Sequence, residues 1–241
     1  MKTLKLLNLL LLGAMAGGST LAAGGDDAAA AVEKQVDGLW MYTGLTSSDG
    51  QEMPLTGIFL FKDGTFVQQA VFDGVPFEEQ GAMAHAGPYE GKSDHVYLLA
   101  EQTISTAPGE NRPLSFRADT EHHVTVDRQG DDLTLVFSMG TGTVQEFERV
   151  GPGEGELYDL ADGALAFVDG HFLLVEGDEQ AVVTGYGTYD RDGSDLQLNV
   201  IRWSEADASG ATNLKDTTLQ ATFDGKVLAL ADGRRFEVVA D

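Results

Sequence analysis

The feature that most constrains this chain is a turn dipeptide, Asp-Gly, which recurs between short runs of β-forming residues. It occurs at 49–50, 63–64, 73–74, 162–163, 169–170, 192–193, 224–225 and 232–233. Asp-Gly readily adopts the positive φ angles of a tight hairpin turn, and the signal is strong where hydrophobic runs flank it, as residues 57–61 and 65–72 do here. No window after residue 35 has a helical apolar stripe over three turns. The pattern therefore predicts an all-β fold of antiparallel hairpins.

The hairpins form two related copies. Residues 62–67 resemble residues 168–173, residues 87–89 resemble 187–189, and the ends of both copies, 123–150 and 220–239, are also similar. The order is the same in both copies. Each copy divides into about eight short strands, enough for a small closed barrel without exposed edges. The sequence predicts two antiparallel β-barrel meanders in tandem, and the alternative is one larger barrel or sandwich built from both copies.

Residues 1–25 have the three parts of a secretory signal peptide. Lys2 and Lys5 form a basic start, a short apolar stretch follows, and small residues around Ala22 and Ala23 offer a cleavage site. The apolar stretch is shorter than the ~20 residues that a membrane span needs. These features predict a protein that is periplasmic or secreted after signal-peptide cleavage, with no stable membrane insertion.

The rest of the chain divides by composition. Residues 26–35 are rich in alanine and acidic residues and predict a disordered or loosely helical lead-in. Residues 36–150 form the first predicted barrel, residues 151–156 are a glycine-rich linker, and residues 157–241 form a second, shorter meander. The chain has no cysteine, so its stability must come from a buried core.

The chain is strongly acidic. It has 39 Asp and Glu against 15 Lys and Arg, a formal net charge of -24, and loss of Lys2 and Lys5 with the signal peptide makes it two charges more negative. Such a field repels nucleic acid and anionic lipid, so no nucleic-acid partner is expected. The negative net charge is typical of a highly solvated surface or of a protein with a cationic partner. The sequence leaves open whether the protein forms homo-oligomers.

A Gly-x-Trp start at residues 38–40 and a late arginine, Arg149, resemble the lipocalins. Residues 57–66, 86–90 and 130–135 are similar to the bacterial lipocalin-like domains, which have a central Asp-Gly hairpin, a Gly-x-Tyr strand and a late Gly-Asp-x-Leu-x-Leu hairpin. The resemblance covers mainly residues 36–150. It implies a barrel closed by Trp40 with Arg149 stacked over it, and a small apolar ligand or, in some members, cyclase or isomerase chemistry inside the barrel.

Alternation along two strands suggests which side chains would face such an interior. His85 and Tyr89 share one face of their strand, and Tyr97 and Glu101 share one face of the next. If both faces point inward, these residues line a ligand site, and His85 with Glu101 could serve as an acid–base pair. The opposite expectation is that they face solvent or bond within the core. The catalytic residues of any enzyme of this kind stay unknown.

His122 and His123 are adjacent, so on a strand they face opposite ways. A metal site would need His85, His95 and one of this pair, but no short-spaced ligand motif supports it, and no metal or other cofactor is expected. The acidic residues at 190–195 fit a hairpin turn better than a calcium loop. Nucleophile motifs and phosphate-binding loops are absent from the sequence.

Three functions stay open from the sequence. The leading hypothesis is an exported lipocalin-like protein that binds a small, mainly apolar molecule in a barrel cavity. The second is a cyclase or isomerase that uses the His85 and Glu101 pair. The third is a non-enzymatic envelope or protein-interaction module in which both barrels are packed solid. An interior filled by large side chains would favour the third over the first.

Overall fold

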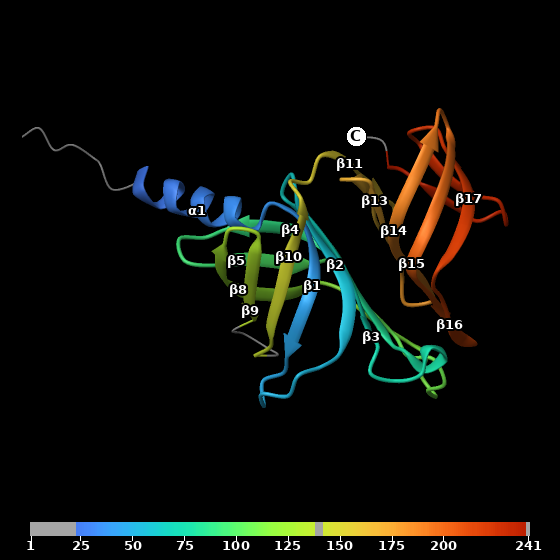
Figure 1. Ribbon diagram of the computed structural model, residues 1–241, viewed down its shortest axis with the longest axis horizontal. Helices are drawn as coiled ribbons and strands as arrows, with labels where there is room; N and C mark the ends of the chain where they lie inside the picture. Colours follow the sequence, from blue (N-terminus) through green and yellow to red (C-terminus); the bar gives the residue numbers. More distant parts are fainter. Residues whose placement is uncertain (1–22, 138–141, 240–241) are drawn as a thin grey trace, which may run out of the picture.

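A computed structural model describes residues 23–137 and 142–239 of the protein, and it contains two antiparallel eight-stranded barrels in tandem (Figure 1). The first barrel is closed, because β3 pairs with β4 as well as with β2. Its strands are β1 (Gly38–Thr46), β2 (Leu55–Lys62), β3 (Thr65–Phe72), β4 (Ala82–Gly91), β5 (Val96–Ala100), β8 (Thr120–Gln129), β9 (Asp132–Phe137) and β10 (Val144–Gly151).

The second barrel is nearly closed. Within the described residues, its first and last strands do not form a ladder, and an isolated bridge between Leu160 and Val238 joins the two edges. Its strands are β11 (Gly155–Leu160), β12 (Gly163–Val168), β13 (His171–Gly177), β14 (Ala181–Asp192), β15 (Asp195–Asp207), β17 (Thr217–Phe223), β18 (Val227–Leu230) and β19 (Arg235–Glu237). Together the two sheets confirm the prediction of tandem barrels over that of a single larger barrel.

Four short elements extend this frame. In the first barrel, β4 pairs with β5 through its last residues and with β6 (Gln102–Thr106) through its first, and β7 (Leu114–Arg117) adds beyond β6. The short helix η1 (Phe77–Glu79) lies between β3 and β4. In the second barrel, β16 (Gly210–Leu214) pairs with one end of β15 and contacts η1. Asn213 Nδ2 donates to the Gln80 carbonyl at 2.7 Å across this contact.

Two of the Asp-Gly turns have the geometry that the sequence predicts. Asp63 and Gly64 both have positive φ, 51° and 79°, where they join β2 to β3. Asp169 and Gly170 repeat this, at 46° and 74°, between β12 and β13. Positive φ at both central positions is the type I′ pattern, whose twist matches that of paired strands.

Helix α1 (Ala23–Val36) covers all of residues 26–35, for which the sequence predicted a disordered or loosely helical lead-in. The helix contacts β4 and β8, and Val36 is fully buried in the core of the first barrel. A Cβ on Gly91 would lie 2.2 Å from the Ala29 carbonyl, so the absence of a side chain there lets the helix approach the strand. The signal-peptide prediction falls mostly on residues 1–22, outside the described residues. No helix of the described part of the chain is long and apolar enough to span a membrane.

The connection between the barrels is shorter than the predicted linker at 151–156. β10 ends at Gly151 and β11 begins at Gly155, so three residues join the two strands. The Asp169 carboxylate accepts hydrogen bonds from the backbone N–H groups of Gly153 and Glu154, at 2.7 and 3.2 Å. These bonds hold the connection against the β12–β13 turn.

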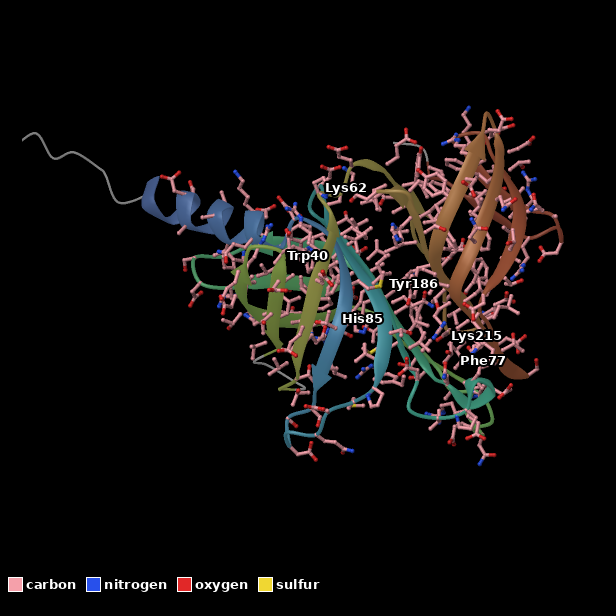
Figure 2. All side chains as sticks on the ribbon, viewed as in Figure 1. Trp40, Lys62, Phe77, His85, Tyr186 and Lys215 are labelled. Atoms are coloured by element: carbon pink, nitrogen blue, oxygen red, sulfur yellow. The ribbon has the colours of Figure 1, made fainter. Side chains whose placement is uncertain are left out.

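The two barrels share a buried apolar interface. Strands β2, β3, β12 and β13 are buried along most of their length, because one face packs inside its own barrel and the other packs against the neighbouring barrel. Tyr186, 1% exposed, lies at this interface (Figure 2). The fully or nearly fully buried members are Leu39, Ile58, Leu60, Val67, Ala84, Ala86, Ile104, Ala164, Ala166, Val168, Leu173, Val175, Val182, Tyr186 and Ala206.

Polar side chains complete the interface. Gln69 Nε2 donates to Thr184 Oγ1 at 2.7 Å, and the hydroxyls of Thr106 and Ser204 lie 2.7 Å apart, with all four residues buried. Such bonds satisfy groups that would otherwise be costly to bury. The interface therefore packs the two barrels against each other as one unit, rather than leaving them as separate domains joined by a flexible linker.

Candidate functional site

The structure separates the four residues that the sequence grouped into a ligand site. His85 and Tyr89 point into the first barrel, where Tyr89 belongs to the core and donates to Asp37 Oδ1 at 2.6 Å. The inward face of β5 carries Val96, Leu98 and Ala100 instead, so Tyr97 lies on the outer face and Glu101 is exposed beyond the end of the strand.

The condition for an acid–base pair of His85 and Glu101, that both strand faces point inward, is not met. Glu101 follows the buried Ala100 and is exposed, whereas His85 is 7% exposed within the barrel. A shift of one residue reverses every side chain of a strand, and the sequence alone does not fix that parity. The cyclase or isomerase hypothesis loses the residue pair on which it was based.

Trp40 lies at the α1 end of the first barrel, and two arginines lie over its ring. The Arg149 guanidinium is 5.8 Å from the ring centroid and that of Arg128 is 5.1 Å away. Trp40 Nε1 donates to the Val36 carbonyl at 2.6 Å, which joins the helix to the ring. This is the arrangement that the Gly-x-Trp resemblance implied, with Arg128 as an addition that the sequence did not suggest.

The second barrel has a counterpart that the sequence did not predict. Trp203 is 1% exposed, and the Arg234 guanidinium lies 5.4 Å from its ring. Gly185 makes room for this ring, because a Cβ there would lie 2.2 Å from it. Glu205 bonds both the indole N–H and Arg234. The signal in the sequence was Trp203 with a late arginine, without the glycine spacing of the first copy.

Large side chains fill the interior of the first barrel. Phe59 and Phe61 stack with centroids 4.3 Å apart, and Phe59 also contacts Phe66 and Phe147. All four phenylalanines are at most 1% exposed. The second barrel is filled in the same way, with Phe167, Phe172, Phe223 and Trp203 in its core. Both barrels thus enclose aromatic clusters.

A polar cluster interrupts the apolar interior of the first barrel. The Tyr42 hydroxyl donates to Gln145 Oε1 at 2.7 Å and accepts from Gln68 Nε2. Burial raises the pKa of Tyr42, with the bond to Gln68 acting in the opposite direction, so the hydroxyl stays protonated. These three side chains satisfy one another within the core.

Two histidines lie in the same interior. The rings of His85 and His122 are 5.8 Å apart, and His122 is 9% exposed. Burial, with smaller contributions from His122 and Arg117, lowers the pKa of His85 to about 3. Burial followed by the charge of Arg117 also lowers the pKa of His122. Both rings are therefore neutral at physiological pH. His85 Nε2, His122 Nε2 and Thr103 Oγ1 have no hydrogen-bond partner among the described residues.

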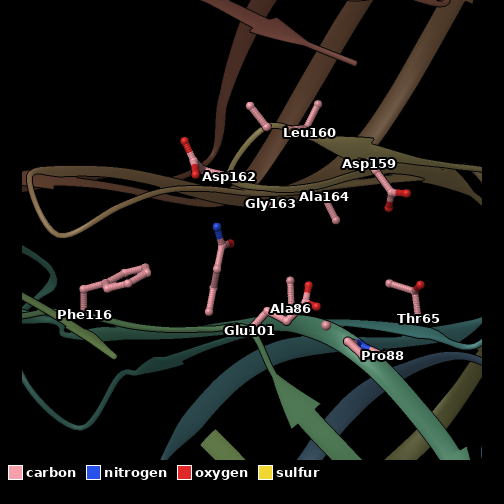
Figure 3. Close-up of a pocket in the computed structure, with 13 residues that line it drawn as sticks. Thr65, Ala86, Pro88, Glu101, Phe116, Asp159, Leu160, Asp162, Gly163 and Ala164 are labelled. Atoms are coloured by element: carbon pink, nitrogen blue, oxygen red, sulfur yellow. The ribbon is translucent and has the colours of Figure 1, made fainter. Parts of the chain in front are cut away.

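An acidic groove lies between the barrels, with a volume of about 450 Å³. Figure 3 shows it as a slot, with Asp159 and Asp162 on the side of the second barrel and Thr65, Glu101 and Phe116 on the side of the first. The three carboxylates are exposed, and none of them forms an ion pair within the described residues. We call this feature the interbarrel groove.

Gln102 lines the groove and connects it to a second hollow. Gln102 is 7% exposed, and its Nε2 donates to the Gly177 carbonyl at 3.1 Å, but its Oε1 has no partner among the described residues. The second hollow, about 330 Å³, shares Asp162 with the groove and is also lined by Glu176 and Asp178. A buried oxygen that lacks a donor is unusual and suits a ligand N–H group.

The pKa of Glu176 indicates that the electrostatic potential in this region is negative. Burial, and then the charge of Asp162, raise the pKa of Glu176 to about 7. A carboxyl group whose pKa is raised by a neighbouring carboxylate lies in a negative potential, and a bound cation would lower that pKa. The groove and the second hollow thus bring several carboxylates and one unpartnered amide oxygen together, an arrangement suited to the N–H groups of an organic cation.

The sequence did not single out the groove. Asp162 belongs to an Asp-Gly dipeptide that was interpreted only as a turn, and Gln102 had no distinguishing motif. The described residues contain no group of three or more His, Cys, Asp or Glu side chains arranged to hold a metal ion. Comparison of the chain with protein-family models, with curated proteins and with solved structures finds no match.

Proposed function

We propose that this protein is a non-enzymatic binding module, in which two solid barrels position an acidic groove that binds a basic segment of a partner protein. The observation that carries the proposal is the buried, unpartnered Oε1 of Gln102 beside Glu101, Asp159 and Asp162. An ammonium or guanidinium group could donate to this oxygen while the three carboxylates balance its charge.

The fixed arrangement of the barrels supports this proposal. The groove draws its walls from both barrels, and the buried interface keeps those walls in place before a ligand arrives. A preformed site loses less free energy in ordering when it binds. The overall negative charge would also attract a basic partner over a distance and increase its rate of association.

The test compares two triple variants with the same change in net charge. Glu101→Gln/Asp159→Asn/Asp162→Asn removes the groove carboxylates, and Asp190→Asn/Asp192→Asn/Asp195→Asn removes three exposed carboxylates from the β14–β15 turn. Binding of a fluorescent peptide that contains lysine and arginine is measured by anisotropy at about 0.15 M ionic strength, where general attraction is screened beyond ~8 Å.

The groove variant should weaken peptide binding about tenfold or more, as expected for the loss of several partly desolvated contacts, each worth up to ~1 kcal/mol. The control variant should change the affinity by less than about twofold at this ionic strength. Equal losses in both variants would mean that the peptide responds only to net charge, and the groove would not be its site.

A second candidate is the binding of a small, mainly apolar molecule in the first barrel, as the lipocalin resemblance implies. The unpartnered atoms of His85, His122 and Thr103 favour it, because they could bond the polar end of such a molecule. The aromatic filling of the interior leaves this candidate less supported than the groove. Native mass spectrometry of the protein purified from its own host tests it, since a stoichiometric bound molecule would support the barrel site and repeated apo masses would count against it.

Export is the remaining part of the proposal. The pattern of residues 1–25 supports a periplasmic or secreted location, where the protein would meet its partner outside the cytoplasm. The intact mass of the protein recovered from its host tests this. A mass that matches a chain beginning near residue 23 to 25 supports cleavage of the signal peptide. A mass that matches the full-length chain, recovered from the cytoplasm, would contradict export.

A further inference from the structure

A second pair of histidines, independent of the groove, lies on the outside of the first barrel. β5 and β8 lie side by side on the part of the barrel that faces away from the second barrel (Figure 1). His123 faces outward from β8 opposite Tyr97, whereas its neighbour His122 faces inward. His95, just before β5, completes the pair.

The two rings are placed for chelation. His95 Nε2 and His123 Nδ1 are 3.1 Å apart, and the rings stack with centroids 4.9 Å apart at an interplanar angle of 27°. Two imidazole nitrogens bound tetrahedrally to one zinc ion, at 2.0–2.1 Å each, lie about 3.3 Å apart. A metal ion that lies off the line between these nitrogens could thus bind both with a small change in their spacing, once the proton between them is released to solvent or His123 carries its proton on Nε2.

A carboxylate orients the pair. Asp94 Oδ1 lies 2.7 Å from His95 Nδ1, which keeps the proton of His95 on Nδ1 and leaves Nε2 as an acceptor toward His123. Carboxylates hold metal-binding histidines in this way, fixing the tautomer and raising the basicity of the ligand nitrogen. Glu121 hydrogen-bonds Tyr97 beside His123 and adds a second negative charge.

We propose that His95 and His123 form a binding site for a divalent transition-metal ion such as Zn²⁺ or Cu²⁺, with Asp94 as the positioning residue. Imidazole nitrogens suit these ions. The His95 side chain is 26% exposed, so a metal ion that keeps water molecules in its remaining positions can reach the pair. The acidic surface favours the approach of a cation.

The experiment titrates Zn²⁺ into the untagged mature protein against a colorimetric chelator, with excess Mg²⁺ to occupy carboxylate-only sites. His95→Gln should lower the Zn²⁺ affinity by about tenfold or more, and Asp94→Asn by about tenfold, in line with the effect of removing a group that orients a metal-bound histidine. His171→Gln in the second barrel removes a histidine outside this pair and should leave the affinity unchanged.

Electron paramagnetic resonance with Cu²⁺ gives a second readout that a change in folding would not imitate. The wild-type spectrum should contain coupling to two imidazole nitrogens, and His123→Gln should reduce it to one. Circular dichroism checks that each variant is folded. The proposal is overturned if wild type does not bind Zn²⁺, if His95→Gln binds as tightly as wild type, or if the Cu²⁺ spectrum lacks imidazole coupling.

Discussion

The two barrels reach similar cores by different means. Each has a buried tryptophan with an arginine over its ring, and each is filled by phenylalanines. The first barrel is closed by the pairing of β3 with β4 and capped by α1, whereas the second is joined across its gap by one bridge. Within residues 142–239, no helix lies at the tryptophan of the second barrel, so only the described tryptophan of the first barrel contacts a capping helix.

The interiors differ more than the frames. Among the described residues, the buried polar side chains of the second barrel are Thr184 and Ser204, which lie at the interface, whereas the interior of the first barrel encloses Gln68, His85, His122 and Gln145. A meander of this type therefore folds without buried histidines, and their presence in the first barrel is a cost that folding does not require. Buried polar groups that stability does not need are good candidates for function. They therefore favour the second candidate function, the binding of a small molecule inside the first barrel.

The largest effect is expected where the two barrels meet. Leu173 is 1% exposed and lies in the interface, so Leu173→Asp would bury an unpaired carboxylate there. The expected loss of unfolding free energy is above ~4 kcal/mol, the range reached by buried unpaired charges. Urea unfolding followed by circular dichroism should change from one transition to two, because each barrel keeps its own core.

The control for this variant is Gln197→Asp, which adds the same charge to an exposed position of β15. It should change the unfolding free energy by less than about 0.5 kcal/mol. A single, slightly shifted transition in Leu173→Asp would show that the barrels do not depend on their interface, and they would then be independent domains.

The tryptophans give the next largest effect. Trp40→Ala and Trp203→Ala should each lower the unfolding free energy by about 3–5 kcal/mol, the usual cost of removing a large aromatic side chain from a core. They should differ in one respect, because only Trp40 holds a helix. Hydrogen exchange should show lost protection in residues 26–36 for Trp40→Ala alone, and loss of that protection in both variants would contradict the separate roles.

The hairpins and the repeat could be predicted from the sequence because both depend on local chemistry. The turns at 63–64 and 169–170 need positive φ angles that Asp-Gly supplies, and alternation correctly placed His122 and His123 on opposite faces. The interface had a weaker signal, since residues 57–61 and 164–168 lack the polar alternation of a strand with one solvent-exposed face. That signal identifies strands buried on both faces but not the partner that covers them.

The candidate site was harder to predict for two physical reasons. The inward or outward direction of Tyr97 depends on strand register, which a one-residue shift reverses. The interbarrel groove combines Gln102 and Glu101 from the first barrel with Asp159 and Asp162 from the second. Those residues meet only because the two barrels pack face to face, and the sequence carries no local mark of that arrangement.

His85, one of the two buried histidines of the first barrel, should make the protein sensitive to acid. The pKa of His85 falls to about 3 in the folded protein, against about 6.5 when unfolded, so the unfolded chain binds more protons between these values. The stability contribution of neutral His85 is therefore lost as pH falls from about 6.5 toward 3. His85→Leu should remove this penalty, which corresponds to about 2 kcal/mol at pH 5.

Denaturant unfolding of wild type and His85→Leu at pH 7.5 and pH 5 measures this contribution. The gain of the variant over wild type should grow as the pH falls. Gln68→Leu serves as the control, because it changes a polar side chain of the same interior without removing a titratable group, and its effect should not depend on pH. A pH-independent difference for His85→Leu would mean that the ring is protonated or solvated in the folded state.

The smallest effect should distinguish the two tryptophan and arginine pairs. Arg234 is the one cation over Trp203 within the described residues, and it also bonds Glu205, whereas Arg149 shares the Trp40 ring with Arg128. A cation over an indole contributes about 0.5–1 kcal/mol at partly exposed sites. Arg234→Ala should therefore lower the unfolding free energy by about 1 kcal/mol, and Arg149→Ala by less than about 0.5 kcal/mol, because Arg128 still covers the ring.

Thermal unfolding of both single variants and of the double variant Arg128→Ala/Arg149→Ala measures the difference. The double variant should lose as much stability as Arg234→Ala. Equal losses for the two single variants would mean that Arg128 does not substitute for Arg149, so that each barrel depends on one arginine.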